Sequence, residues 1–491
     1  MTAFSDLMAF VRETQALKEV QGRLGWDQET VMPRGAAPQR AEEMAALEKV
    51  LHARKMDPYL VDLLEAVRRE DAVGRAQIRE IRRETERARK VPADLAAEIT
   101  RVTSLAQGIW AEARAKDDFA GFAPTLAQVL ALRRLEAQAL AGEGGDLYDA
   151  LLDDYEPGET GASLDAMFAA MRPRLVALRE NVLGSGTVPP ALTGDFDPAR
   201  QMVLAETCAR SFGYDFDHGR IDRAVHPFSS GSGLDSRITT RTDPENIFDC
   251  LYSTIHETGH SSYEQNVDRA YLLTPIGRGC SMGVHESQSR IYENQLGRSR
   301  GFTSWLYARC RETFGEIGVD GPEAFYAAVN AVCPGYIRTE ADEIHYNLHI
   351  LLRFDLERAL IAGDLEVPDL EAAWNDRFAA DFGVAVDRPS NGVLQDVHWA
   401  VGLFGYFPTY TLGNVYAGCL FEAMRRDCPD WEDELAAGSA AGPTAWLRER
   451  LQRHGALRSP RETIEEATGG PVTVAPLLDY LDAKFGALYG R

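Results

Sequence analysis

Two histidines and a glutamate in one short stretch have the spacing of a metal-dependent hydrolase. The chain reads HETGH at residues 256–260. On a helix, positions four apart lie on one face, so the imidazoles of His256 and His260 can reach the same tetrahedral Zn²⁺. Glu257 then lies beside the metal, where it can take a proton from the attacking water and pass it to the leaving amine. This pattern indicates a zinc hydrolase.

The residues before this stretch favour a helix. Asp243 reads as an N-cap, followed by a proline and an acid that suit a first helical turn. Ile247, Leu251 and Ile255 then follow at four-residue spacing, which predicts a buried apolar face. The HETGH stretch is therefore expected about three turns into a helix with an apolar back.

The third zinc ligand must come from another element. A catalytic zinc takes three protein ligands and keeps one position open. A second helix is expected after Gly283, ending near Gly297, and it carries His285, Glu286 and Glu293. The two glutamates lie two turns apart and can share a face. Spacing alone therefore leaves all three residues as candidates.

Several separated motifs resemble the thermostable carboxypeptidase Taq family of zinc metallocarboxypeptidases. They are HPF at 226–228, DSRIT at 235–239, HETGH at 256–260, HESQ at 285–288, IRTEAD at 337–342 and GVLQDVHW at 392–399. The stretch WDQETVMP at 26–33 also resembles the family's opening segment, and family-like sequence continues through 406–413. Because the motifs occur in the family's order, the resemblance covers nearly the whole chain.

The resemblance implies a complete metal site. Glu286 of the HESQ motif becomes the third ligand, beside His256 and His260, with one Zn²⁺ per subunit. His285 and Glu293 become supporting residues. From the residues alone, His285 is equally a packed core histidine, and Glu293 reads first as a solvated carboxylate on a helix surface.

Removal of a C-terminal residue requires a group that binds the substrate's free carboxylate. Arginine suits this role because its planar fork binds a carboxylate bidentately and stays charged. By resemblance, Arg338 is the first candidate, with Arg237 in the same subsite or in its wall. The alternative for each arginine is a purely structural pair, with Asp342 and Asp235 respectively.

Negative charge that develops on the substrate's carbonyl oxygen needs a further donor. His398 in the QDVHW segment and the tyrosines just after it, Tyr406 and Tyr410, are the candidates for this donor and the nearby substrate contacts. Aromatic residues at such spacing are often only core residues. His226 lines the cleft by resemblance, or is a turn residue before a proline.

The predicted activity is a zinc metallocarboxypeptidase that releases single C-terminal amino acids, with Glu257 as general base and acid. The resemblance adds a homodimer, broad specificity with C-terminal proline disfavoured, and replacement of Zn²⁺ by Co²⁺. One alternative is a zinc oligoendopeptidase with the same metal site, which would also accept amidated peptides. The other is a non-catalytic peptide-binding protein, although an intact Glu257 argues against it.

The expected architecture is all-α, with a small β-sheet near the active site. Helical patterns recur from end to end, and β-branched residues cluster at 238–240. The resemblance implies a gluzincin-like two-lobed fold with a deep central groove. Turn-forming residues at 184–198 predict a loop between lobes of one catalytic unit, residues 1–491.

Charge and cysteine content narrow the partners and the compartment. The net charge of −23 argues against nucleic acid, whose phosphates would be repelled. The seven cysteines are scattered without a CXXC pair, which indicates reduced thiols in a cytoplasm. Because no long apolar run occurs, a soluble cytoplasmic protein that acts on peptides away from membranes is expected.

Overall fold

The computed structural model describes residues 2–490, so the first and last residues of the expected unit lie outside it. Helices dominate, and a single small sheet accompanies them in this described part, as the sequence predicts. The chain divides into two compact units. Unit 1 consists of Met1–Ala88, Pro189–Asn330 and Cys419–Val472, and unit 2 of Arg89–Val188, Ala331–Gly418 and Thr473–Arg491. One boundary falls inside the 184–198 loop. The predicted groove stays a prediction.

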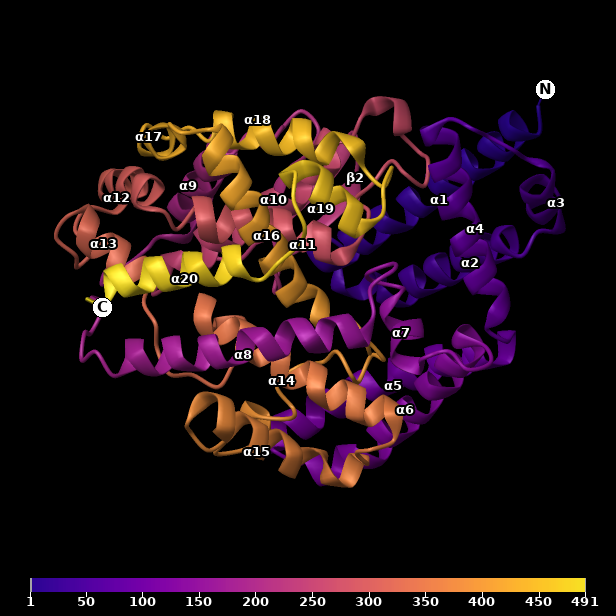
Figure 1. Cartoon of the computed structure of the whole chain (residues 1–491), viewed down its shortest axis with the longest axis horizontal. Helices are drawn as coiled ribbons and strands as arrows, with labels where there is room; N and C mark the ends of the chain where they lie inside the picture. Colours follow the sequence, from indigo (N-terminus) through magenta and orange to yellow (C-terminus); the bar gives the residue numbers. More distant parts are fainter. Residues whose placement is uncertain (1, 491) are drawn as a thin grey trace. The chain divides into compact units, whose positions relative to one another are not determined.

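Unit 1 contains the sheet and the HETGH helix (Figure 1). Its elements are α1 (Ala3–Thr30), η1 (Arg34–Ala36), α2 (Ala37–Lys55), α3 (Pro58–Ala66), most of α4 (Ala72–Lys90), α9 (Pro198–Ser211), β1 (Ile221–Arg223), β2 (Ser229–Ser232), β3 (Asp235–Thr240), α10 (Ile247–Asn266), η2 (Arg269–Tyr271), α11 (Met282–Arg290), the π-helical η3 (Ile291–Leu296), α12 (Arg300–Phe314), α13 (Pro322–Val329), the second half of α16 (Pro408–Asp427), α17 (Trp431–Ala436), α18 (Ala441–Arg450), η7 (Gln452–His454) and α19 (Pro460–Thr468).

Unit 2 is built around α14, which packs against α8 and α15 (Figure 1). Its elements are α5 (Ala93–Lys116), α6 (Phe119–Ala141), α7 (Leu147–Leu152), α8 (Gly161–Leu183), η4 (Arg338–Glu340), α14 (Glu343–Ala362), η5 (Val367–Asp369), α15 (Leu370–Phe382), η6 (Pro389–Asn391), the first half of α16 and α20 (Ala475–Leu488). Among the described residues, no helix is both long enough and apolar enough to cross a membrane.

Helix α10 begins three residues later than the sequence predicts. Asn246, not Asp243, is the N-cap, and its side chain accepts a hydrogen bond from the backbone N–H of Phe248. The carboxylate of Asp243 instead accepts the N–H of Glu245 two residues on, a local turn that competes with a helix start. The predicted apolar back is confirmed, because Ile247 and its partners at four-residue spacing are fully buried.

Close packing on both sides of α10 fixes the position of this helix. At Gly259, a Cβ atom would lie 2.6 Å from the carbonyl oxygen of Gln288 and 2.6 Å from the Cα of Ser289, so only glycine lets α11 approach. On another side, the hydroxyls of Ser236 in β3 and Ser261 lie 2.6 Å apart. In the sheet, β3 is central, parallel to β1 and antiparallel to β2. The glycine of HETGH therefore sets how closely α11 lies.

Two capping residues define α14, the central helix of unit 2. The carboxylate of Asp342 accepts the N–H groups of Ile344 and His345, each at 3.0 Å. Gly363 ends the helix in the left-handed region, with φ of +88°. Because α14 is covered by its neighbours, most of its side chains are buried, including the guanidinium of Arg353. A charge buried there needs a partner close by.

Candidate active site

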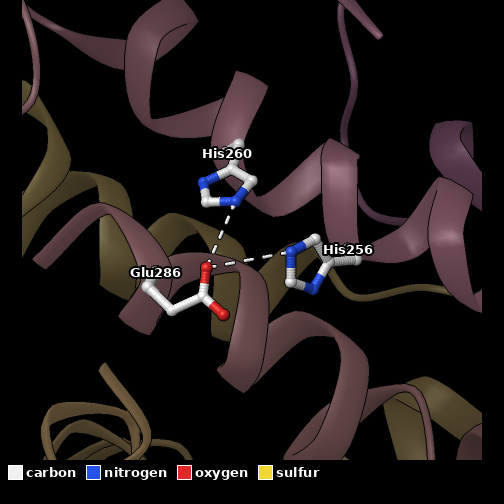
Figure 2. A group of neighbouring side chains, drawn as sticks. All are labelled: His256, His260 and Glu286. Carbon is white, nitrogen blue, oxygen red and sulfur yellow. Dashed lines mark ion pairs between the residues drawn. The ribbon is translucent and has the colours of Figure 1, made fainter. Parts of the chain in front are cut away.

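The side chains of His256, His260 and Glu286 converge on one point (Figure 2). The two histidines lie one turn apart on α10, and the glutamate comes from α11. Oε2 of Glu286 lies 3.8 Å from Nε2 of His256 and 3.4 Å from Nε2 of His260. The three potential ligand atoms all lie within 4.8 Å of one another. This spacing suits a single small cation.

Glu293 lies behind His256, away from the other ligand atoms. Its Oε2 is 2.8 Å from Nδ1 of His256, which therefore donates and leaves Nε2 free to bind a metal. Arg290 and Arg298 also donate to Glu293, at 3.3 and 3.1 Å. Glu286 and Glu293 both contact His256 and Arg290, but Glu286 faces Nε2 of the imidazole and Glu293 faces Nδ1, a distinction that their sequence spacing does not make.

The π-helical stretch η3 gives Glu293 this position. It continues α11 directly and ends against Gly297, so the predicted end of the second helix is confirmed. A π-helix changes the rotation per residue, so positions seven apart no longer project in the same direction as in an α-helix. Glu286 and Glu293 can therefore face opposite sides of the imidazole of His256.

Burial and neighbouring charges oppose one another at Glu286. Burial disfavours its ionised form, but Arg290 and then His256 outweigh burial and hold the pKa of Glu286 well below its usual range. The Nε of Arg290 donates to Oε1 of Glu286 at 2.6 Å. Oε2 is the atom that faces the two histidines. Glu286 is therefore ionised at neutral pH, as a ligand must be.

Glu257 is buried beside these ligands, and one of its oxygen atoms has no hydrogen-bond partner. Burial is the main cause that raises its pKa to about 7, against the lowering effect of His256, and Glu286 adds to the rise. A carboxyl group with such a pKa can accept and release a proton near neutral pH.

The residues fit a zinc ion with an open coordination position. Two imidazoles and one carboxylate are a common ligand set for catalytic zinc. The unpartnered oxygen of Glu257 is a second observation that fits, because a buried carboxylate oxygen without a donor is costly unless a ligand or water serves it. His256, His260 and Glu286 would hold the ion.

A second charged cluster lies in unit 2, around Arg338. The Nε and Nη2 of Arg338 donate to Oδ1 of Asp396 at 3.1 and 2.9 Å, and Nη1 donates to the hydroxyl of Tyr346 at 3.2 Å. Arg353 donates from Nε to the other oxygen of Asp396 at 2.8 Å. Despite its burial, Asp396 has a pKa well below the usual range because of Arg338 and Arg353. Arg338 does not pair with Asp342, the structural partner considered from the sequence.

His398 and the two predicted tyrosines belong to this same cluster. Nε2 of His398 lies 3.3 Å from the hydroxyl of Tyr410, and its ring lies 4.4 Å from that of Phe407. The ring of Tyr406 contacts Tyr410 edge to face at 5.3 Å. Burial is the main cause that lowers the pKa of His398 to about 4, so its imidazole is neutral at neutral pH.

The two remaining predicted residues lie in unit 1. Arg237 in β3 donates from Nε and Nη2 to Asp235, at 2.7 and 2.9 Å, and its guanidinium lies 4.5 Å from the ring centre of Trp26. This is the structural pair that the sequence raises as the alternative. His226 lies exposed in the turn between β1 and β2. Neither residue belongs to the group of three potential metal ligands.

Sequence reasoning missed several residues that hold the site together. Arg290 follows Glu286 by four residues, so helical periodicity could have indicated it. Arg353 contacts Asp396 43 residues further along the chain, for which the sequence gives no local signal. Tyr346 accepts a hydrogen bond from Arg338 eight residues before it, across the start of α14, where helical periodicity does not apply.

A mostly helical fold in which an HEXXH helix and a glutamate from the next helix form one metal site defines a class of metallopeptidases. Comparison with known proteins supplies the family. The family model described as "Carboxypeptidase Taq (M32) metallopeptidase" matches residues 6–485. The chain therefore belongs to the M32 carboxypeptidase Taq family and is a metallocarboxypeptidase.

Individual relatives extend over the full chain. Thermostable carboxypeptidase 1 of Thermus thermophilus is 41% identical over 99% of each chain. The crystal structure of an M32 carboxypeptidase from Deinococcus radiodurans matches with a TM-score of 0.95 and 38% identity over 100% of both chains. Metallocarboxypeptidase 1 of Trypanosoma cruzi matches with a TM-score of 0.96 and 33% identity, over 98% of this chain and 99% of that one.

Proposed function

We propose that this metallocarboxypeptidase uses Zn²⁺ to release single amino acids from peptides with a free C-terminal carboxylate. The observation that carries the proposal is the convergence of two Nε2 atoms on one oxygen of Glu286, beside the buried and partly unpartnered carboxyl group of Glu257. His256, His260 and Glu286 would hold the zinc, which would polarise the scissile carbonyl and acidify a water molecule.

Glu257 handles the proton in this proposal. Its unpartnered oxygen accepts the proton of the attacking water, and the same group then protonates the nitrogen of the departing amino acid. Burial raises the pKa of Glu257 to about 7 in the metal-free protein, and a bound metal would favour the ionised form that accepts the proton of the water. Glu293 and His285 keep the ligand histidines oriented while this happens.

The cluster of unit 2 supplies the proposed substrate contacts. Arg338 binds the terminal carboxylate, because Asp396 holds its guanidinium in place while Arg353 shares the negative charge of Asp396. His398 or Tyr410 donates to the developing oxyanion, and Tyr406 contributes to the substrate-binding surface. Both donors are held in place by aromatic contacts within the cluster.

Arg237 and His226 keep supporting roles in the proposal. Arg237 forms part of a substrate-binding wall through its fixed pair with Asp235. His226 is the exposed residue that contributes to the cleft. The family resemblance also supports one Zn²⁺ per subunit that Co²⁺ can replace, a homodimer in the cytoplasm, and broad specificity with C-terminal proline disfavoured.

Mass spectrometry of one peptide in two forms tests the activity. A short peptide, as the free acid and as the C-terminal amide, is incubated with zinc-loaded wild type, Glu257→Gln and Glu245→Gln. Glu245 is an exposed carboxylate just before α10, so it is a matched control for the loss of a negative charge. We expect stepwise loss of single residues from the free acid alone, retained in Glu245→Gln and abolished in Glu257→Gln.

Other outcomes would replace the proposal. Internal cleavage of both peptides would indicate an oligoendopeptidase with the same metal site. Absence of cleavage by a zinc-loaded and folded wild-type protein would instead favour a peptide-binding protein. Equal activity of wild type and Glu257→Gln would remove Glu257 from the proton transfer.

A further inference from the structure

A line of side chains leads from the ligand His260 away from the metal site. Nδ1 of His260 lies 2.6 Å from Nδ1 of His285, and Nε2 of His285 lies 2.9 Å from Oε1 of Glu264. Glu264 is one turn after His260 on α10 and is only 6% exposed. The other ligand, His256, instead meets the carboxylate of Glu293 directly.

The contact between two Nδ1 atoms leaves the position of the protons ambiguous. One nitrogen must donate and the other must accept, because two bare nitrogens or two N–H groups repel. If His285 donated from Nδ1, then His260 would carry its own proton on Nε2. That proton would block the nitrogen that faces Glu286 and the metal site. The correct choice therefore has to be imposed from outside the pair.

Glu264 can impose this choice. An ionised carboxylate only accepts hydrogen bonds, so Nε2 of His285 must carry the proton that it donates to Glu264. When Nε2 of His285 carries the single ring proton, its Nδ1 is bare and accepts from Nδ1–H of His260. As a result, Nε2 of His260 is left with a free lone pair. The order of donors thus runs from His260 through His285 to Glu264.

The surroundings hold His285 and Glu264 in this arrangement. The backbone N–H of Gly279 donates to the same oxygen of Glu264, at 2.9 Å. A Cβ atom on Gly279 would lie 2.7 Å from Cδ2 of His285, so the glycine lets this loop close over the ring. The ring of Tyr263 lies 5.4 Å from that of His285. The ring is therefore confined from more than one side.

We propose that Glu264 is a positioning residue that selects, through His285, the tautomer in which His260 can bind the metal. This inference rests on the metal site proposed above and adds a residue that does not contact the metal. Loss of such outer partners typically weakens metal binding about 10- to 100-fold. Because Glu264 acts only through His285, its effect must depend on that histidine.

Zinc affinity measured by competition with a chromogenic chelator tests this coupling. The proteins are wild type, Glu264→Leu, Glu264→Gln, His285→Leu and the double variant Glu264→Leu/His285→Leu. We expect Glu264→Leu to bind Zn²⁺ about 10- to 100-fold more weakly than wild type. Glu264→Gln keeps an acceptor oxygen and should lie closer to wild type. In the His285→Leu background, Glu264→Leu should have little further effect.

A matched control separates this role from general damage to α10. Gln265 is the next residue and bonds to the loop at Asp215, so Gln265→Leu removes hydrogen bonds from the same helix end. Its zinc affinity should equal that of wild type. Thermal unfolding of each metal-free variant reports loss of the Gly279 contact, which lowers the melting temperature without depending on His285. Wild-type affinity in Glu264→Leu, or additive losses in the double variant, would overturn the proposal.

Nitrogen-15 NMR of histidine-labelled, metal-free wild type gives a test that needs no destabilising variant. We expect the protonated nitrogen to be Nδ1 in His260 and Nε2 in His285, with the signals assigned by their loss in single histidine variants. The reverse pattern would overturn the tautomer selection even if the metal site is correct. Failure of wild type to bind Zn²⁺ would refute the proposed metal site. The positions of the two ring protons would still show whether Glu264 selects the tautomer of His260.

Discussion

The two charged clusters of this protein differ in the sign of the charge that they leave uncompensated. In unit 1, Glu286 and Glu293 face Arg290 and Arg298, while Glu257 lies beside them as a further carboxyl group without a cationic side chain bonded to it. In unit 2, two guanidiniums share the single carboxylate of Asp396. The first cluster can accept a cation, and the second can accept an anion.

Each cluster is suited to bind a group of the opposite charge. Burial of a charge is costly unless a partner of opposite charge is close. In the first cluster, the metal cluster of Glu257, Glu286 and Glu293, this cost appears as the raised pKa of Glu257, about 7, which a bound dication would lower. In the second, the arginine cluster of Arg338, Arg353 and Asp396, the cost appears at Arg353, whose pKa is lowered by burial to about 10. A divalent metal would relieve the first cluster, and a substrate carboxylate would relieve the second.

Removal of a ligand carboxylate should break the metal cluster completely. In Glu286→Gln, the oxygen that faces both histidines loses its charge. Loss of a residue that only hydrogen-bonds to a metal ligand weakens metal binding by up to about 100-fold. Loss of the ligand itself should weaken zinc binding by more than this and abolish peptidase activity. Chelator competition and peptide cleavage measure the two effects. A variant that still binds Zn²⁺ as wild type does would exclude Glu286 as a ligand.

Removal of the central charge should break the arginine cluster in a different way. In Asp396→Asn, Arg338 and Arg353 keep their charges but lose the group that separates them. Leaving buried charges unpaired costs about 3–5 kcal/mol, so the urea concentration at the midpoint of unfolding should fall clearly. Asp479 pairs with Arg174 at the surface of the same unit, so Asp479→Asn should change little. Equal midpoints for both variants would contradict the predicted coupling.

The sequence predicts the two clusters unequally well, for a physical reason. Helical periodicity is local, so the HETGH stretch and its apolar back predict α10 and both histidine ligands. Residues seven apart share a face of a regular α-helix, so periodicity could not separate Glu286 from Glu293. The π-helical stretch that contains Glu293 changes the direction of its side chain, and the sequence did not predict that stretch. The pair of Arg353 with Asp396 depends on packing between distant segments, and only the resemblance pointed to that region at all.

Replacement of Arg338 tests whether the arginine cluster binds the substrate carboxylate. Arg338→Lys keeps the charge but loses the planar fork that binds a carboxylate bidentately. We expect kcat/KM for a free-acid peptide to fall at least about 30-fold, the equivalent of the roughly 2 kcal/mol or more that such a buried contact loses. Steady-state cleavage assays measure it.

The exposed Arg241, which pairs with Asp249, provides the matched arginine-to-lysine control. Arg241→Lys should keep the kcat/KM of wild type, because a surface ion pair of this kind contributes little. Unchanged kcat/KM in Arg338→Lys would remove Arg338 from carboxylate binding and leave it a structural residue.

The smallest expected effect is a pH dependence of zinc affinity that only the metal cluster should show. Below about pH 7 the metal-free protein holds a proton on Glu257, because burial raises the pKa of that group. A bound dication favours the ionised form, so zinc binding releases the proton, and zinc affinity rises with pH by up to about tenfold per unit until pH 7. Glu257→Gln has no such proton, so its zinc affinity should rise less steeply between pH 6 and 7.

His256 accounts for the dependence of zinc affinity on pH that remains in Glu257→Gln, because Glu286 and Glu293 raise the pKa of His256 against the effect of burial. Chelator competition at pH 6, 7 and 8 measures both slopes, with Glu245→Gln as the control expected to follow wild type. Identical slopes in wild type and Glu257→Gln would show that Glu257 is already ionised before the metal binds.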